Sequence, residues 1–350
     1  MAQKLPLTEF HKNQLGAKMG EFAGFEVPLE FSGCIIEHVQ TRNNVSLCDA
    51  SHMRVYKIDR KFFQKLNFLI PRRISSDSFG AMYVIFLNCQ GGIEEDSIMY
   101  LLDDIYIVGN ALNCLTFPRY LREHSIEFEM IEPVIFALQG PRSKAFASGF
   151  FPKLPLSKDD VIAKPQSGIL FISQTGYTGE LGYEIFFSDV DLARKFALWC
   201  LDASIQFCGL IARDTLRLET GFTLYGNELS PDFSPLESDL KWILDDQKDF
   251  LAKDRLREES FLSRFYLKEF SGVPRKGFVV TDDTGRVVGS VTSGAKTPCI
   301  DHPIGFVRIH NVEKCSSYFV KIRDRSVSLQ LVNQNELRAK IKREGDATSE

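Results

Sequence analysis

The spacing of apolar residues predicts a first block of strands and helices between residues 52 and 132. Apolar runs that alternate with polar residues, the pattern of half-buried strands, surround two helix-like segments near residues 60–69 and 114–124. The predicted strands are residues 53–58, 80–89, 91–102, 103–111 and 126–131, with a hairpin turn at Asp103 and Asp104. Their order predicts a β-α-β-β-α-β unit of the ferredoxin-like kind.

A second block of similar order follows residue 132. Its predicted strands are residues 133–139, 168–176 and 182–187. One predicted helix begins at Gly140-Pro141, and a second spans residues 191–203. Ahead of both blocks, residues 7–18 and 34–45 predict helices on either side of a Gly/Pro-punctuated turn region. Because the chain lacks regular βαβ alternation and a G-x-G-x-x-G after a strand, the pattern favours an α+β class over a doubly wound sheet.

The C-terminal third has a different pattern. Residues 245–270 are dense in alternating charge with helical spacing, which predicts an exposed linker helix. Short strands broken by Gly, Asp and Ser then predict a small β-barrel or sandwich over roughly residues 273–333. The predicted domain boundaries are residues 1–51 with 133–244 for domain one, 52–132 for domain two, 245–272 for the charged linker helix, 273–335 for the barrel, and 336–350 for a disordered tail.

Composition and charge narrow the classes of partner. The chain is 44% hydrophobic and 25% charged, as in ordinary soluble globular proteins. Its formal net charge of -4 gives no overall attraction to nucleic acid, so we expect no nucleic-acid partner. No window approaches the roughly 20 apolar residues of a membrane span, so we expect no membrane contact. The N-terminus has neither a signal-peptide core nor a transit-peptide composition, which predicts a cytoplasmic protein, or a mitochondrial-matrix protein if this is a mature eukaryotic form.

Cysteine and histidine spacing does not predict a metal site. The eight cysteines form no C-x-x-C pair and are expected to be reduced and mostly buried. The six histidines are scattered, without a recognisable ligand spacing. We therefore expect a protein that uses no bound metal.

The segment GGIEEDSIMY, residues 91–100, places three carboxylates in a predicted strand. Strand side chains alternate between faces, so Asp96 shares a face with Glu94, Ile98 and Tyr100. A carboxylate on a partly apolar face is commonly paired, shifted in pKa or engaged with a ligand, because an unpaired buried charge is costly. The alternative is an edge strand with a solvated acidic face.

The segment IARDTLRLETGFTLYGNEL, residues 211–229, is the other unusual stretch. On a helix, Arg213 and Arg217 lie one turn apart, and Asp214 can offset the charge of Arg217. Arg213 then needs a partner. It could clamp a carboxylate or a planar heterocycle, or it could form a salt bridge within the protein, for which Glu184 is a candidate.

These segments, with several others, resemble the aminomethyltransferase of the glycine cleavage system, the T-protein family. The resemblance runs from about residue 6 to residue 310 through the blocks PLTEFHKNQLGAKMGEFAGFEVPLEF, CDASHM, GGIEEDSIMY, ALQGP, GYTGELGYEI, GLIARDTLRLETGFTLYGNEL, SPLE and GSVTSGAKTP. It implies a three-domain cloverleaf around a folate site, with two ferredoxin-like α/β sandwich domains and a C-terminal small β-barrel. The implied reaction moves a methylene from the aminomethyl-lipoyl arm of the H-protein to tetrahydrofolate and releases ammonia.

The resemblance also implies roles for particular residues. Asp96 matches the family's catalytic aspartate and is expected to hydrogen-bond or relay a proton at N10 of the folate. Glu184 is expected to bind the donor-rich edge of the pterin. The remaining expected folate contacts are Met53, Tyr83, Tyr100, Asn110, Tyr177 and Arg213. The expected partners are the lipoylated H-protein and folate, with no metal.

Other functions on the same fold stay open at this point. One is a folate-dependent demethylase that uses a different donor. Another is a folate-binding or interaction protein without transferase activity. The K-G-C-x-x-G-Q motif of the relatives that support iron–sulfur clusters is not found in this chain, which favours the transferase.

Overall fold

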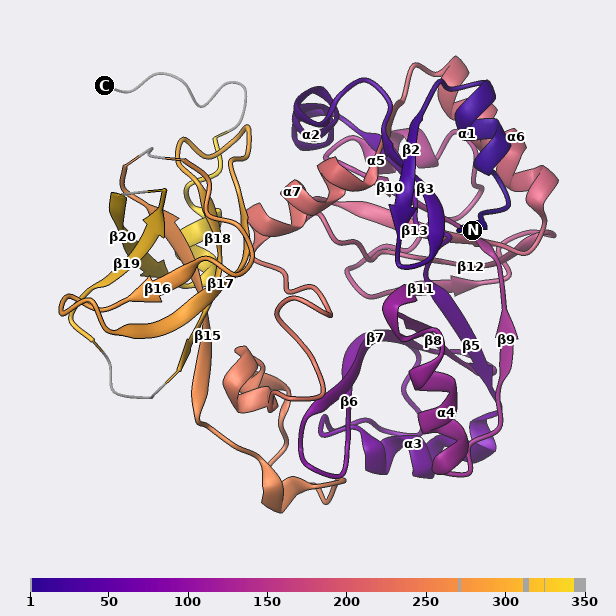
Figure 1. The fold of residues 1–350 in the computed structure, drawn as a ribbon. Helices are drawn as coiled ribbons and strands as arrows, with labels where there is room; N and C mark the ends of the chain where they lie inside the picture. The colour runs from indigo at the N-terminus through magenta and orange to yellow at the C-terminus, as the bar shows by residue number, and fades with distance from the viewer. Residues whose placement is uncertain (1, 270–271, 311–314, 324, 343–350) are drawn as a thin grey trace. The chain divides into compact units, whose positions relative to one another are not determined.

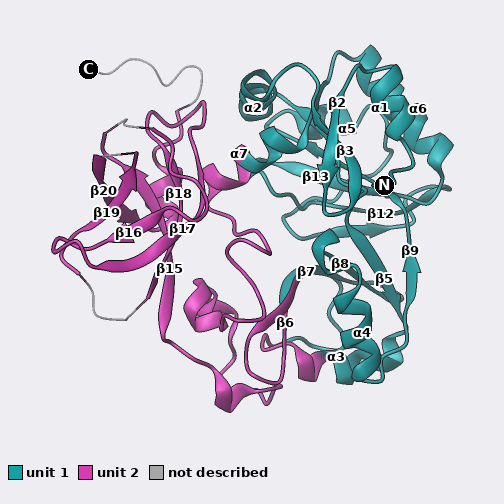
Figure 2. Ribbon diagram, in the orientation of Figure 1, with its two compact units in different colours: residues 1–66, 74–84, 97–214 teal, residues 67–73, 85–96, 215–350 magenta. Residues whose placement is uncertain are grey.

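The computed structural model describes residues 2–269, 272–310, 315–323 and 325–342 (Figure 1). The chain divides into two compact units (Figure 2). Unit 1 contains residues 1–66, 74–84 and 97–214, and unit 2 contains residues 67–73, 85–96 and 215–350. This division into two units does not test the predicted boundaries of three domains, which stay a prediction.

The largest sheet of unit 1 has six strands in the order β11-β12-β13-β10-β4-β14. The strands are β4 (Ser46–Asp49), β10 (Val134–Gln139), β11 (Val161–Ala163), β12 (Ile169–Ser173), β13 (Gly182–Phe187) and β14 (Gln206–Cys208). The helices that accompany them in the chain are α1 (Thr8–Asn13), α2 (Cys34–Asn43), α5 (Ser143–Ala147), α6 (Val190–Asp202) and α7 (Leu210–Thr220). The second predicted block is therefore present, with its strands and helices close to the predicted ranges.

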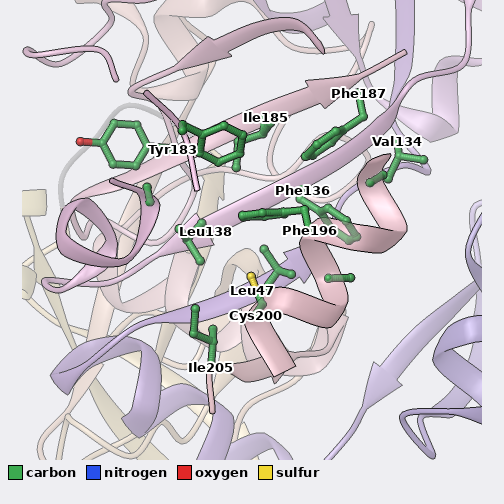
Figure 3. Close-up of a cluster of buried hydrophobic side chains, with 14 of the residues drawn as sticks. Leu47, Val134, Phe136, Leu138, Tyr183, Ile185, Phe187, Phe196, Cys200 and Ile205 are labelled. Carbon is green, nitrogen blue, oxygen red and sulfur yellow. The ribbon is translucent and has the colours of Figure 1, made fainter. Parts of the chain in front are cut away.

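One face of this sheet carries an aromatic core (Figure 3). Phe136 of β10, Phe187 of β13 and Phe196 of α6 are each at most 1% exposed. The Phe187 and Phe196 ring centroids lie 5.7 Å apart. Because each buried phenylalanine contributes roughly 1.5–3 kcal/mol, this core holds α6 on the sheet. It leaves the opposite face of β13, which carries Glu184 and Phe186, for a second cluster.

The predicted turn region at residues 22–33 is wrong for most of its length. The chain forms β2 (Lys18–Phe22) and β3 (Phe25–Glu30), an antiparallel pair with β1 (Gln3–Lys4) on its edge. The turn is confined to Ala23 and Gly24, which both have positive φ. Gly and Pro do not interrupt the whole segment, because Gly24 shapes only the hairpin turn and Pro28 lies within β3.

The first predicted block folds as a five-stranded sheet in the order β6-β7-β8-β5-β9. Its elements are β5 (Arg54–Ile58), η1 (Arg60–Phe62), α3 (Phe63–Leu69), β6 (Gly80–Leu87), β7 (Ile93–Leu101), β8 (Ile105–Gly109), η2 (Ala111–Asn113), α4 (Thr116–Glu123) and β9 (Glu129–Ile131). The turn between β7 and β8 lies at residues 102–104, so the predicted hairpin is confirmed.

Six antiparallel strands close a barrel in unit 2, in the order β15-β18-β17-β16-β19-β20. They are β15 (Ser260–Leu267), β16 (Val279–Thr281), β17 (Val287–Ala295), β18 (Ile304–His310), β19 (Tyr318–Ile322) and β20 (Arg325–Val332). The α+β class with a C-terminal barrel is confirmed. Within the described residues, none of the helices is long and apolar enough to cross a membrane.

The predicted linker helix at residues 245–272 is wrong. Its only helical turn among the described residues is η5 (Lys253–Arg255), and Ser260–Leu267 is a barrel strand. Lys248 donates to the carbonyls of Asn67, Ile70 and Arg72, which fixes the preceding segment in turns. These tertiary contacts outweigh a helical charge pattern whose pairs contribute only about 0.2–0.5 kcal/mol each.

The predicted disordered tail is partly wrong. Helix α8 (Gln334–Arg338) begins with a capping box between Asn333 and Glu336, and Leu337 is fully buried. Residues 343–350 of that tail lie outside the described residues. Among its described residues unit 2 also contains two further short helical turns, η3 (Pro235–Ser238) and η4 (Lys241–Ile243).

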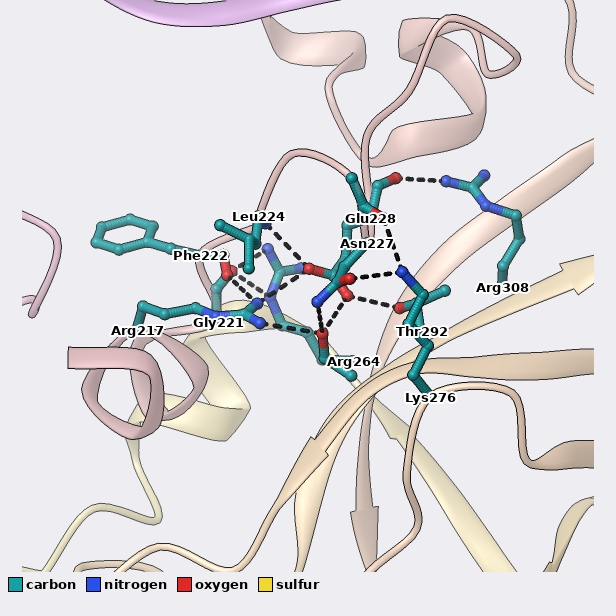
Figure 4. A network of polar contacts seen from close by, with 12 residues as sticks. Arg217, Gly221, Phe222, Leu224, Asn227, Glu228, Arg264, Lys276, Thr292 and Arg308 are labelled. Atoms are coloured by element: carbon teal, nitrogen blue, oxygen red, sulfur yellow. Dashed lines mark hydrogen bonds and ion pairs between the residues drawn. The ribbon is translucent and has the colours of Figure 1, made fainter. Parts of the chain in front are cut away.

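A buried carboxylate, Glu228, organises the polar interior of unit 2 (Figure 4). Glu228 accepts hydrogen bonds from Arg217 at 3.0 Å and from the Thr292 and Ser293 hydroxyls at 2.7 Å each. Arg217 thus pairs with the Glu228 carboxylate, eleven residues along the chain, a partner that helical spacing did not suggest. Arg308 adds a donor to the Glu228 carbonyl.

Candidate active site

Glu184 is a buried carboxylate in the middle of the six-stranded sheet of unit 1. Strand β13 lies between β12 and β10, and Glu184 pairs in register with Ser173 and Ala137. Its Oε2 accepts a hydrogen bond of 2.5 Å from the Thr175 hydroxyl. Burying a carboxylate on a central strand costs free energy unless it accepts hydrogen bonds. The nearby Thr175 hydroxyl supplies one here.

Arg213, on α7, faces this carboxylate. Its Nη2 lies 3.9 Å from Glu184 Oε1, which is an ion pair too long to be a hydrogen bond. Its Nη1 is buried and has no hydrogen-bond partner among the described residues. The Tyr177 ring centroid lies 5.1 Å from the guanidinium carbon, a cation–π contact. The predicted salt bridge is present, and it leaves donor capacity on Arg213.

Tyr100, on β7, reaches the same carboxylate through its hydroxyl. That hydroxyl lies 3.2 Å from Ser173 Oγ and 3.5 Å from Glu184 Oε2. Its ring is fully buried and packs 4.7 Å from the Phe171 ring centroid. Burial and the Glu184 charge raise the Tyr100 pKa well above 10.0, so the phenol stays protonated. Tyr100 therefore offers a hydroxyl to Glu184, whereas its ring packs in the core.

The boundary between the two units divides β7, and Asp96 is the last residue of the strand that belongs to unit 2. The strand alternates as predicted: Glu94, Asp96 and Ile98 are half-buried, and Glu95 on the other face is fully buried. This excludes a fully solvated acidic face, which was the alternative interpretation of the triplet. The proposed catalytic role of Asp96 is not tested by these contacts.

The glycine pair before the acidic triplet fixes the start of β7 within unit 2. A Cβ on Gly92 would lie 1.7 Å from the Pro231 carbonyl oxygen, and Gly91 has φ +80°. Ile93 donates to the Phe233 carbonyl at 3.0 Å. Only glycine permits this close approach of two backbones, so GG sets where the acidic strand begins.

The other predicted folate contacts lie in unit 1. Met53 packs against the cluster that contains Tyr100. Tyr83 is half-buried on β6, and Asn110 is half-buried directly after β8. None of these three takes part in the contacts described above, so their place in a folate site stays a prediction.

His52 is a functional candidate that the sequence analysis did not single out. It is 7% exposed, and its Nδ1 is buried without a hydrogen-bond partner among the described residues. Burial, together with the positive charge of Arg213, lowers the pKa of His52 from 6.5 to about 4. The signal was its place in CDASHM, directly before Met53. A neutral imidazole beside the site keeps a second cation away from Arg213.

We expect His52 to make stability depend on pH. The folded protein keeps His52 neutral down to about pH 4, whereas the unfolded chain takes up the proton near 6.5. Its contribution is therefore fully present above pH 6.5 and is lost as pH falls toward 4, by roughly 3 kcal/mol in total. Urea unfolding of wild type and His52→Gln between pH 7.5 and 4.5 checks this. Parallel pH profiles for the two proteins would contradict it.

The chemistry of these groups suits an edge that carries both a hydrogen-bond donor and an acceptor. Glu184 supplies a carboxylate acceptor, and Arg213 supplies an unsatisfied donor 3.9 Å away. Tyr177 adds an aromatic face under the guanidinium. A pterin edge has this combination of groups, so the residues present fit a folate.

A hollow of about 620 Å³ lies elsewhere, in unit 2. Arg264 in its wall is already bound to Asp239 at 2.6 Å and to the Gly221 carbonyl. None of the predicted site residues lines it, so it does not compete as the active site.

Comparison with known proteins gives one consistent family. The family described as the GCVT N-terminal domain matches residues 7–248. A protein named aminomethyltransferase from Chlorobaculum tepidum is 34% identical over 329 residues, covering 87% of this chain and 89% of that protein. Another of that name from Chloroherpeton thalassium is 32% identical and covers 91% of this chain and 94% of that protein. The crystal structure of glycine cleavage system aminomethyltransferase T from Bartonella henselae matches with a TM-score of 0.87 and 29% identity, over 95% of this chain and 97% of that one.

Proposed function

The chain belongs to the GCVT family of aminomethyltransferases, the T-proteins of the glycine cleavage system, and from that premise we propose how its own residues serve the reaction. The methylene of the aminomethyl group on the lipoyl arm of the H-protein is transferred to tetrahydrofolate, ammonia is released, and the dihydrolipoyl arm remains. Tetrahydrofolate supplies the N5 and N10 nitrogens that take up the carbon.

The paired but incompletely satisfied Glu184 and Arg213 are the observation that carries the proposal. Their 3.9 Å separation and the unpartnered Arg213 Nη1 suit a ligand that donates to one and accepts from the other. Glu184 holds the pterin edge, and Arg213 with Tyr177 orients the ring. This placement sets the geometry of the reacting nitrogens, which is where a positioning enzyme gains most of its rate.

Asp96 is proposed to act at N10 of the folate. A half-buried carboxylate can hold or accept a proton there and orient that nitrogen toward the incoming carbon. The protein would thus contribute one acid–base group and a binding frame. Met53, Tyr83, Tyr100 and Asn110 are proposed to complete the pocket.

The donor, the absence of a metal and the location of the reaction are also part of the proposal. The donor is the lipoylated H-protein, and no metal ion takes part. The relatives above are bacterial, which supports a cytoplasmic location for the reaction.

The first experiment mixes purified protein with tetrahydrofolate and aminomethylated lipoyl H-protein and follows methylene-tetrahydrofolate and ammonia. We expect both products in equal amounts, and none without the H-protein. Binding of tetrahydrofolate without either product would instead favour a demethylase with another donor, or a binding protein of the same fold.

Glu184→Gln is expected to weaken tetrahydrofolate binding about 10- to 100-fold, because hydrogen bonds to a charged group contribute roughly 1.5–3 kcal/mol. Titration calorimetry with the folate measures the dissociation constant directly. The matched control is Glu132→Gln, whose carboxylate side chain is 56% exposed and pairs with Arg54. Equal affinities for the Glu184 variant and wild type would remove Glu184 from the site.

A further inference from the structure

The two backbone carbonyls that flank Tyr177 are held by buried polar side chains. Gln139 Nε2 donates to the Thr175 carbonyl at 3.1 Å. Arg42 Nη1 donates to the Thr178 carbonyl at 2.6 Å. Tyr177 itself is half-buried, and it lies between two fixed points on a loop that otherwise joins β12 to β13.

The Gln139 carboxamide fills the inside of this loop. Its Oε1 accepts from the Thr178 hydroxyl at 2.8 Å. Cβ atoms built on Gly176 and Gly182 would lie 2.0 and 2.2 Å from that carboxamide. The glycines at 176 and 182 therefore let the loop close tightly around one side chain.

Arg42 brings the charge that holds the loop from the α2 side. Its side chain is 1% exposed, and the same Nη1 lies 2.9 Å from Glu180 Oε1 in a salt bridge. A buried guanidinium needs strong acceptors, and here a carbonyl and a carboxylate of the same loop supply them. Movement of the loop would break both of these contacts.

Helix α2 also reaches the helix that carries Arg213. Glu37, fully buried on α2, accepts a hydrogen bond of 2.8 Å from the Gly209 amide, directly before α7. A Cβ on Gly209 would lie 2.1 Å from the Leu29 carbonyl oxygen, so this start of α7 is tightly placed. One helix thus contacts both segments that bring Tyr177 and Arg213 together.

We infer that Arg42 is a positioning residue for the folate site: with Gln139 it fixes the loop that places Tyr177 beneath Arg213. The inference rests on the proposed function. Arg42 acts through the loop and does not itself contact the ligand. An ordered loop gives affinity because the ligand no longer has to immobilise Tyr177 on binding.

Two variants test the inference, with one measurement in the free protein and one with folate. Arg42→Met removes the donor at similar length, and Arg42→Lys keeps the charge but loses the planar fork. We expect chymotryptic cleavage after Tyr177, followed by mass spectrometry, to become about tenfold faster in Arg42→Met. The KM for tetrahydrofolate should rise about tenfold with kcat within about threefold, and Arg42→Lys should lie between wild type and Arg42→Met in both readouts.

Arg60 offers a matched control in the same unit. It donates to the carbonyls of Ser76 and Ser78 on another loop. Arg60→Met should speed cleavage after the exposed Phe79 and leave cleavage after Tyr177 and the folate KM unchanged. Glu180→Gln, which keeps the Arg42 contact to Thr178, should change the KM less than Arg42→Met.

The outcomes separate this inference from the proposed function. Wild type that forms no methylene-tetrahydrofolate refutes the proposed function, and the role in a folate site fails with it. Wild-type product with an unchanged KM in both Arg42 variants refutes the inference alone. If both Arg42 variants increased cleavage after Tyr177 and after Phe79 by the same factor over wild type, the substitutions would loosen the unit as a whole. That result would also refute the inference.

Discussion

Asp96→Asn is expected to lower kcat for methylene transfer by roughly 10²- to 10⁴-fold, the range for loss of one general acid–base group. Asparagine keeps the size of the side chain and a hydrogen-bonding oxygen but cannot hold or release a proton. Tetrahydrofolate affinity should change little, because the pterin edge is assigned to Glu184 and Arg213. Single-turnover formation of methylene-tetrahydrofolate, with folate affinity from calorimetry, measures the two effects separately.

Glu94→Gln is the matched control for this variant. Glu94 and Asp96 are half-buried on the same face of β7, so each substitution removes one negative charge from the same surface. The Glu94 variant should keep kcat within about threefold of wild type. Similar losses in both variants would mean that the charge of the face, rather than Asp96, supports the reaction. Full activity of Asp96→Asn would exclude the proposed proton role.

Glu228→Gln is expected to lower the free energy of unfolding of unit 2 by roughly 3–5 kcal/mol, because it removes the carboxylate of a buried ion pair with Arg217. Glu228 and Arg217 are at most 1% exposed and lie 3.0 Å apart. The new amide would also turn one accepting atom into a donor facing Arg217, or facing the Thr292 and Ser293 hydroxyls (Figure 4). Urea unfolding followed by circular dichroism and by hydrogen exchange of the barrel strands reports the change.

Asp239→Asn provides the comparison within the same unit. Asp239 pairs with Arg264 at 2.6 Å, but its side chain is 52% exposed, so water screens the charge. The expected loss is less than about 1 kcal/mol. If both variants were equally stable, the Glu228 network would not be a main support of the barrel.

The residues of the site differ in how far the sequence could place them. Glu184 and Arg213 lie in blocks with clear family resemblance, and their pairing was a stated candidate. Thr175, which makes the shortest contact to Glu184, gave no comparable signal, because a threonine near a turn is common. His52 likewise became a candidate only through its burial and the nearby charge of Arg213.

Periodicity by itself determined the α+β class, the strands and helices of both blocks, the β7–β8 hairpin and the two-faced character of the acidic strand. These depend on residues within one strand or helix, whose side chains repeat every 2 or 3.6 positions. The family resemblance added the expected function and site residues. The glycines at 92, 176, 182 and 209 can be read from the sequence, but the close approaches that require them are visible only in the structure.

Only the tertiary structure decided the features that depend on distant partners. It turned the charged segment at 245–272 into turns and the β15 strand (Ser260–Leu267), because Lys248 finds carbonyls near residue 70 and because the barrel needs a strand between β18 and β20. It gave Arg217 the Glu228 carboxylate, and it placed Arg42 under the Tyr177 loop. A buried charge needs a partner however far apart the two residues lie in the sequence, because an unpaired buried charge is costly. A local sequence pattern cannot show which distant residue that partner is.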